Sequence, residues 1–147
     1  MSKRKSTKEF CQELQKMSID ELTETYVSMI ERAKKNPRDD DALRAIIISR
    51  REIHERNQDD YFMEKVKDLG ERGIIPSRIV LLEHTKYKLY ERGETRRDIK
   101  RRIEQNTLRP FICVMVMNTV PIKVQARITK ETINAVVEMF KVSRLIY

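Results

Sequence analysis

The sequence predicts a mainly α-helical protein with a small β element. Charged residues make up 37% of the chain and hydrophobic residues 39%, a balance that suits thin helical layers with solvated faces. The chain has only three Gly and four Pro, too few for a turn-rich β-sandwich or barrel. Apolar residues recur at steps of three and four over much of its length, as on one face of a helix. We therefore expect an N-terminal helical bundle, a basic helix pair, a β-hairpin and a C-terminal helix.

Three parts are expected along the 147 residues. Residues 1–7 are basic and read as a flexible tail. Residues 8–70 form a helical scaffold or oligomerisation part. Residues 74–147 form a basic helix-turn-helix-like region, followed by the hairpin and the last helix. A chain of this length is about one domain's worth and buries enough surface for a core of its own.

Helix start signals divide the N-terminal part into three or four helices. Ser18 and Glu21 have the spacing of a capping box, which begins a helix by satisfying its first N–H groups. The segment 57–60 is either a break or a continuation of the helix before it. The predicted helices begin near Lys8, Ile19, Asp39 and Tyr61, and they end near Met17, Asn36, Arg56 and Gly70.

The second part begins with a pair of helices and ends with a hairpin and a helix. Pro76 and Ser77 announce a helix that runs to about Arg92, where Gly93 stops it. Thr95 caps a short helix that follows. The predicted later elements are a helix over 96–105, an apolar strand over 111–117, an alternating strand over 122–128 and a helix over 130–147 that Thr129 caps.

Positive charge is concentrated in residues 72–109, at the start of the second half of the chain. The chain carries a formal net charge of +8, and residues 72–109 hold eleven Lys or Arg against five acids. A basic surface of this kind favours a polyanionic partner, because each neutralised phosphate releases counterions. The candidate nucleic-acid contacts here are Arg92, Thr95, Arg96, Arg97, Lys100, Arg101 and Arg102. The alternative is a solvated helix whose Lys and Arg stems cover apolar surface.

The segment 88–103 resembles a helix-turn-helix motif. Gly93 stands at the turn, Thr95 caps the next helix, and Ile99 falls where the second helix of that motif packs inward. The resemblance implies that Arg96, Arg97 and Lys100 face DNA. Leu89 departs from the motif, which favours a small residue four positions before the turn glycine. A helical hairpin without DNA is the alternative.

The strand predicted over 122–128 and the helix after it resemble the start of a ribbon-helix-helix protein. That resemblance implies that Lys123, Gln125 and Arg127 read base edges in the major groove. An ordinary hairpin packed over a helix is the alternative. Because a lone hairpin is marginally stable, pairing of its edge across a two-fold axis predicts a homodimer.

Several function classes are excluded or disfavoured. No apolar run reaches the roughly 18 residues of a membrane span, and no apolar segment follows the basic N-terminus as in a signal peptide. We expect a cytoplasmic protein, on the nucleoid or, in a eukaryote, in the nucleus. Cys11, Cys113, His54 and His84 are isolated in sequence, so we expect no zinc and no other cofactor.

The leading hypothesis is a sequence-selective or semi-specific regulator of transcription that binds double-stranded DNA. RNA is the less favoured ligand, because only Tyr87 and Tyr90 lie near the basic run to stack on bases. The rival is a helical adaptor or inhibitor that binds a protein through the apolar stripes Ile19–Ala33 or Ile133–Leu145. Arg78 and His84 also resemble an Arg-x₄₋₆-His element of a helical ribonuclease family. Since no other catalytic arrangement is visible, we expect no enzyme.

Overall fold

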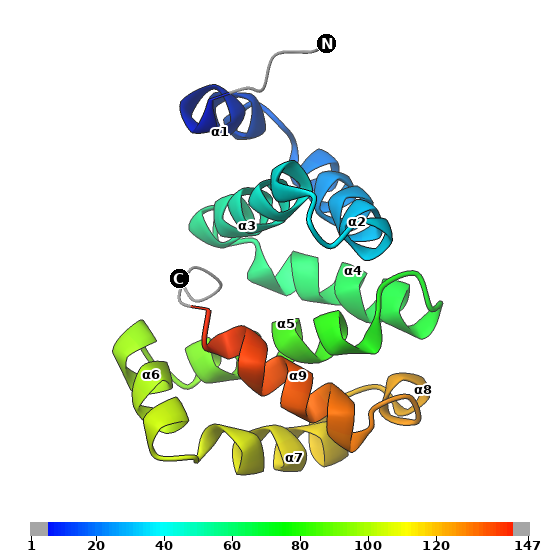
Figure 1. Ribbon diagram of the computed structural model, residues 1–147, viewed down its shortest axis with the longest axis vertical. Coiled ribbons are helices and arrows are strands. Elements are labelled where there is room, and N and C mark those ends of the chain that lie inside the picture. Colours follow the sequence, from blue (N-terminus) through cyan, green and yellow to red (C-terminus); the bar gives the residue numbers. More distant parts are fainter. Residues whose placement is uncertain (1–5, 143–147) are drawn as a thin grey trace. The chain divides into compact units, whose positions relative to one another are not determined.

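The computed structural model describes residues 6–142, and every regular element in that range is a helix (Figure 1). The expected tail residues 1–5 and residues 143–147 of the expected C-terminal helix lie outside the described residues. The chain divides into two compact units, 1–62 and 63–147. The helices are α1 (Thr7–Gln15), α2 (Ile19–Lys35), α3 (Asp40–Glu55), α4 (Asp59–Glu71), α5 (Ser77–Glu91), α6 (Arg96–Glu104), α7 (Leu108–Thr119), α8 (Ile122–Gln125) and α9 (Lys130–Phe140).

The first unit is built on the pairing of α2 with α3. Ser18 and Glu21 form the expected capping box at the start of α2, and Asp39 accepts a hydrogen bond from the Ala42 N–H at the start of α3. Arg56 donates hydrogen bonds to carbonyl oxygens at the end of α1, including Leu14 O at 3.2 Å. The apolar stripes of the two long helices supply the core, through Leu22, Tyr26, Ile30, Ala42, Ala45 and Ile53.

Asn57 resolves the open question about the segment 57–60. It adopts a left-handed backbone with φ of 56°, a conformation that Asn tolerates better than most residues and that ends a helix. The segment is therefore a break between α3 and α4. Asp59, at the start of α4, lies 2.7 Å from the buried guanidinium of Arg50.

The second unit surrounds α5. Helices α7 and α9 pack against α5 and against each other, and α6 packs against α7 (Figure 1). Gly70 lets α4 approach α5 closely, because a Cβ at this position would lie 2.6 Å from Cγ2 of Val80. The helix α4 accordingly continues through Gly70 to Glu71 and does not stop at the first glycine. The buried residues of α5 point in all directions around its axis: Val80, Leu81, Leu82, Glu83, His84, Thr85, Lys86 and Leu89.

The predicted β-hairpin is wrong. The apolar run 111–117 lies inside α7, and 122–125 forms the single turn α8. Buried Ile112 and Met115 share one face of α7, whereas Val114 and Met117 are exposed on another. A continuous apolar run does not distinguish a strand from a helix by periodicity, and here the exposed face of the helix is apolar as well. Pro110 fits because it stands in the first turn, where its missing N–H breaks no helical hydrogen bond.

Two consequences follow for the hypotheses built on the hairpin. The resemblance to a ribbon-helix-helix protein loses its strand, since no strand is found among residues 6–142. The homodimer stays a prediction, but the edge-pairing argument for it disappears with the hairpin.

Candidate nucleic-acid interface

The start of α6 is fixed by local hydrogen bonds. The N–H and Oγ1 of Thr95 donate to Oδ2 of Asp98 at 2.8 and 2.9 Å, and the Asp98 N–H donates back to Thr95 Oγ1 at 3.3 Å. These bonds from Thr95 hold the pKa of Asp98 below its usual value, aided by Arg101 and Arg97. Gly93, at φ of 82°, forms the left-handed turn after α5. Thr95 as the cap and Gly93 as the turn act as the sequence predicted, while the contact of Thr95 with nucleic acid stays a prediction.

The inner face of α6 is packed and paired. Ile99 is fully buried. Arg102 donates two hydrogen bonds to Glu94, at 2.5 and 2.7 Å, and its guanidinium lies 4.9 Å from the ring centroid of Phe111. The bonds to Glu94 raise the pKa of Arg102. Arg102 therefore holds α6 to its neighbours and is not a free contact.

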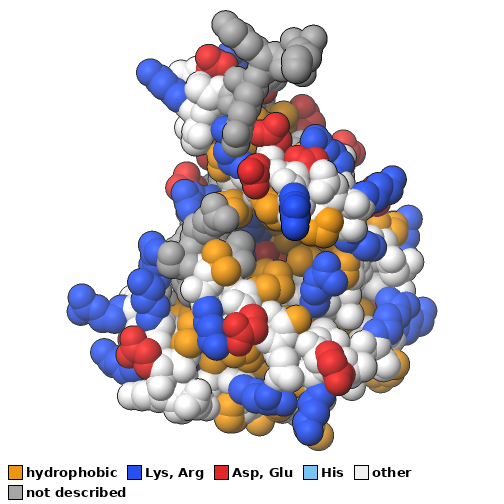
Figure 2. Space-filling model, viewed as in Figure 1, with side chains coloured by type: hydrophobic (Ala, Val, Ile, Leu, Met, Phe, Trp, Pro, Cys, Tyr) orange, Lys and Arg blue, Asp and Glu red, His pale blue; other side chains and the backbone are white. Residues whose placement is uncertain are grey.

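The outer face of α6 carries the unpaired cations. Arg96, Arg97, Lys100 and Arg101 are all exposed, and none of them makes an ion pair with a carboxylate among the described residues. At 100° per residue they lie within an arc of about 140°. Glu104 lies on the same arc, but one carboxylate against four cations still leaves an excess of positive charge. We call these four residues the cationic arc. Lys and Arg side chains project where α6 lies, at the lower left of Figure 2.

Other predicted contacts have structural partners instead. Arg92 lies 3.7 Å from Glu94 and 5.6 Å from the Phe111 ring centroid. Gln125 donates to Val116 O at 2.6 Å and to Val120 O at 3.1 Å, which satisfies carbonyls at the end of α7. Arg127 donates to Gly70 O at 2.7 Å and so closes the end of α4. Lys123 is exposed on α8.

The basic segment 72–109 is therefore divided. Lys86 forms a buried ion pair with Glu83 at 2.9 Å, Lys88 lies 3.7 Å from Glu91, and Arg72 lies 3.2 Å from Asp68. Arg78 and Arg109 are exposed, but they lie on other helices than α6. Within the basic surface expected from the sequence, the cationic arc is the part where exposed cations lie together on one helix.

The helix pair α5–α6 has the connection expected of a helix-turn-helix. Leu89 and Ile99 are both fully buried on either side of the turn. However, α6 packs chiefly on α7, so α5 is not its main packing partner. Recognition of DNA by this pair stays a prediction.

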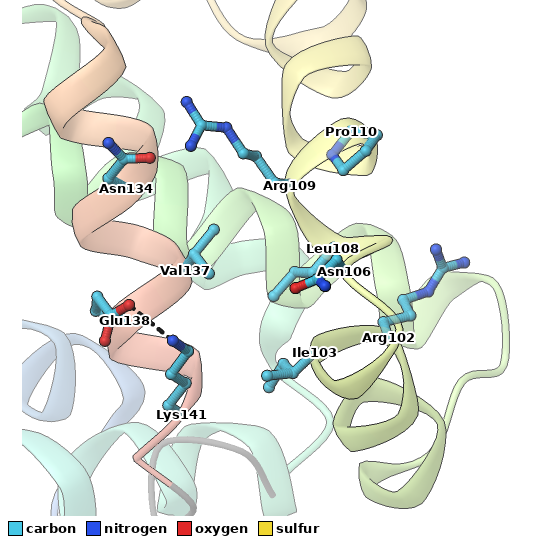
Figure 3. Close-up of a pocket in the computed structure, with 10 residues that line it drawn as sticks. All are labelled: Arg102, Ile103, Asn106, Leu108, Arg109, Pro110, Asn134, Val137, Glu138 and Lys141. Carbon is cyan, nitrogen blue, oxygen red and sulfur yellow. Dashed lines mark hydrogen bonds and ion pairs between the residues drawn. The ribbon is translucent and has the colours of Figure 1, made fainter.

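A cavity of about 490 Å³ opens beside α6, between α7 and α9 (Figure 3). Ile103, Leu108 and Val137 provide apolar lining. Arg109 extends toward α9, whereas Arg102 extends away from the cavity. Lys141 is paired with Glu138 at 2.8 Å. Most of the charged and amide residues that line it are exposed, so the cavity is open to solvent.

The ribonuclease-like pair is not assembled at the surface. His84 is only 2% exposed, and both of its ring nitrogens lack a hydrogen-bond partner. Burial, together with the positive charges of Lys67 and Lys88, lowers the pKa of His84 to about 4 against the opposing effect of Glu83. Arg78 is exposed. The imidazole cannot meet a substrate at the protein surface, so the structure gives this resemblance no support.

Sequence reasoning missed Glu94 and Phe111, which hold two of the predicted contacts, Arg92 and Arg102. Nothing in the local pattern marks Glu94 as the partner of Arg102, eight residues away. The signal for Phe111 was hidden because the run that it begins resembled a strand.

Comparison with known proteins found no matching family model, curated protein or solved structure. Over residues 6–142, no helix has both the length and the hydrophobicity needed to cross a membrane. The same range contains no group of three His, Cys, Asp or Glu side chains that could hold a metal ion. Cys11 and Cys113 are half-buried free thiols. The exposed cations on α6 can bind anions.

Proposed function

We propose that this protein binds the phosphate backbone of nucleic acid, with duplex DNA as the preferred form, through the cationic arc of α6. The observation that carries the proposal is that Arg96, Arg97, Lys100 and Arg101 are exposed together and lack carboxylate partners among the described residues. Cations already paired inside the protein release less free energy on meeting a phosphate, because the existing partner must first be given up. The arc has a smaller penalty, because Arg97 and Arg101 interact with Asp98 only at longer range and form no ion pair with it.

The dimensions of the arc suit a polyanion of high charge density. From Arg96 to Arg101 the helix rises by five steps, or about 7.5 Å, and duplex DNA carries about one negative charge per 1.7 Å of its axis. The charge spacing along the arc is therefore of the same order as that of duplex DNA. The capping box at Thr95 and the Arg102–Glu94 pair hold the arc in place, which reduces the entropy lost on binding.

Duplex DNA is favoured over single-stranded RNA because the aromatic rings near the arc are not openly exposed. Tyr87 and Tyr90 are only partly exposed, and the Phe111 ring is flanked by the guanidinium groups of Arg92 and Arg102. Single-stranded RNA is generally recognised by stacking of bases on open aromatic faces. The finer proposal of a transcription regulator rests on the N-terminal half of α6 reaching base edges, as the second helix of a helix-turn-helix does.

A paired substitution tests the binding surface. The variant Arg97→Ala/Arg101→Ala removes two cations of the arc, and Lys34→Ala/Lys35→Ala removes two exposed cations at the end of α2. Fluorescence anisotropy with a ~20-bp duplex should show at least a tenfold loss of affinity for the first variant and little change for the second. Equal losses would mean that net charge and not the arc drives binding, and no loss would place binding elsewhere. A specific and a random duplex, compared in the same assay, report sequence selectivity.

The adaptor hypothesis stays a prediction, but its two apolar stripes are only partly exposed. Leu22, Tyr26 and Ile30 of the first stripe are buried within the first unit, and Val136 and Phe140 of the second are buried within the second unit. Leu145 lies outside the described residues. Ile19 and Met29 of the first stripe and Ile133 and Val137 of the second are partly exposed.

A further inference from the structure

An apolar strip runs along the outside of α7 and onto α8. Val114, Met117 and Ile122 are 61%, 78% and 83% exposed, and the partly exposed ring of Phe111 lies at the N-terminal end of the strip. We call these four residues the α7–α8 strip. Figure 2 shows hydrophobic side chains together with Lys and Arg along the lower edge of the molecule, where Figure 1 places α7.

The strip is not a consequence of an incomplete core. Ile112 and Met115, on another face of α7, are buried in the second unit, and Val120 and Val124 are buried beside them in sequence. The core therefore has its own apolar residues, and the strip adds a second apolar face to the same helix. Exposed apolar side chains that cluster in this way mark interaction surfaces more often than scattered ones do.

The stretch of sequence that contains the strip carries positive side chains and no negative ones. From Gln105 to Lys130 the chain contains no Asp or Glu. Lys123 is exposed next to Ile122. At the other end, Arg92 and Arg102 lie against Phe111 and share the single carboxylate of Glu94. Both ends of the strip thus keep positive charge.

From this pattern we propose that the α7–α8 strip binds an amphipathic helix of a partner protein whose apolar face is flanked by acidic residues. Val114 and Met117 are separated by one helical turn, which is the spacing that an apolar stripe on a facing helix matches. Acidic groups at one end of the partner helix would meet the exposed Lys123, and those at the other end would meet the net positive charge that Arg92 and Arg102 keep after they share the carboxylate of Glu94. Complementary charge of this kind fixes the orientation of the partner and raises the association rate.

Two other occupants fit the observations less well. A second copy of the chain would bring one basic strip against another, and like charges in such contact are unfavourable. An anionic membrane would match the charge, but interfacial helices insert bulky aromatic and leucine side chains. The most exposed side chains here are one Val, one Met and one Ile, the ring of Phe111 is flanked by Arg92 and Arg102, and the chain has no Trp.

This inference does not rest on the proposed nucleic-acid binding. Ile99 and Arg102 direct the inner face of α6 toward its neighbours, and the cationic arc lies on the outer face of that helix. The two surfaces use different residues and can be tested by different variants.

The probe is a fluorescent helical peptide of ~15 residues, with Leu at every third or fourth position and Glu at the others. Two control peptides replace Glu by Lys or redistribute the Leu residues so that no apolar face forms. The full-length protein should bind the Glu peptide in fluorescence anisotropy and neither control. Binding to the Lys peptide with equal affinity, or to none of the three, would overturn the proposal.

Substitutions then locate the site. Val114→Ser/Met117→Ser should weaken binding of the Glu peptide about tenfold, and Lys123→Glu should weaken it several-fold. Val142→Ser is the matched control, because Val142 is exposed to 43% away from the strip, and it should leave binding unchanged. Circular dichroism confirms that all variants fold. Equal effects of the strip and control variants would contradict a helix as the occupant. So would a concentration-dependent dimer that Met117→Ser abolishes. Binding to phosphatidylserine vesicles that Met117→Ser abolishes would also contradict it.

Discussion

The helices α5 and α6 are joined by one glycine turn, yet they place their charges in opposite environments. In α5, Glu83, His84 and Lys86 are at most 2% exposed. In α6, four cations are exposed and only Arg102 of the basic residues is held by a carboxylate among the described residues. Both helices lie in the segment whose surplus of Lys and Arg suggested one continuous surface.

The difference shows that a count of basic residues does not measure a binding surface. A cation inside the protein is already compensated by its neighbours, so removing it changes the stability of the fold and not the affinity for a polyanion. Removing a cation on an outer arc should change the affinity for a polyanion and leave the stability of the fold almost unchanged. The predictions below test this contrast, beginning with the residues of α5.

The largest effect is expected from breaking the buried pair of α5. Lys86→Met leaves Glu83 without the ammonium group that lies 2.9 Å away, and breaking a buried ion pair lowers the free energy of unfolding by about 3–5 kcal/mol. Urea unfolding followed by circular dichroism measures the loss. Arg97→Ala on α6, the matched surface change, should alter the same quantity by at most about 0.5 kcal/mol.

The double variant Glu83→Leu/Lys86→Met sharpens this result. It removes both charges and should recover a large part of the stability lost in Lys86→Met, because apolar residues replace a buried ion pair at little net cost. A single variant no more destabilised than Arg97→Ala would mean that α5 is not the buried helix described above.

The next effect concerns the pH dependence of His84. The folded state lowers the pKa of His84 from 6.5 to about 4, so between these values the unfolded chain binds the proton more readily. Stability should therefore fall as the pH decreases from 6.5 toward 4, by about 3 kcal/mol over the full range.

His84→Leu tests the origin of that slope. Leucine has no proton to bind, and the two ring nitrogens that lack partners in the wild type are removed. Urea unfolding at several pH values should show a shallower loss of stability below pH 6.5 in the variant than in the wild type. Parallel curves for the two proteins would assign the acid sensitivity to carboxylates instead.

A smaller effect is expected at the turn that separates the two helices. Gly93 has φ of 82°, and a Cβ there would meet no atom within 4 Å. Gly93→Ala should therefore lower the free energy of unfolding by about 1 kcal/mol through backbone strain alone. Gly93→Asn should lower it less, because Asn tolerates the left-handed conformation. Thermal denaturation compares the two, and equal stability of Gly93→Ala and the wild type would contradict the strained turn.

Local signals in the sequence predicted the helix boundaries well. Ser18, Asp39, Thr95 and Thr129 all cap the helices that they were expected to begin, since capping depends on residues three positions apart. Gly93 was equally readable, because its role depends only on the backbone of the turn. These features need no knowledge of the rest of the fold.

Features that depend on distant partners were not predictable in the same way. Arg127 was expected to read DNA, but it closes the end of α4 by donating to Gly70 O, 57 positions away. Gln125 was assigned to an alternating strand, and its amide instead satisfies the carbonyls that end α7. The apolar exposed face of α7 concealed the helical period of 111–117 and produced the predicted hairpin.

The central claim is that the cationic arc of α6 makes the phosphate contacts. The salt dependence of duplex binding tests it most directly, as the slope of log K against log salt concentration for the wild type and for Arg97→Ala/Arg101→Ala. Each phosphate contact contributes about 0.9 to the magnitude of that slope. The variant should therefore show a slope smaller by about 0.9 for each arginine in contact with a phosphate. Identical slopes for the two proteins would contradict the claim.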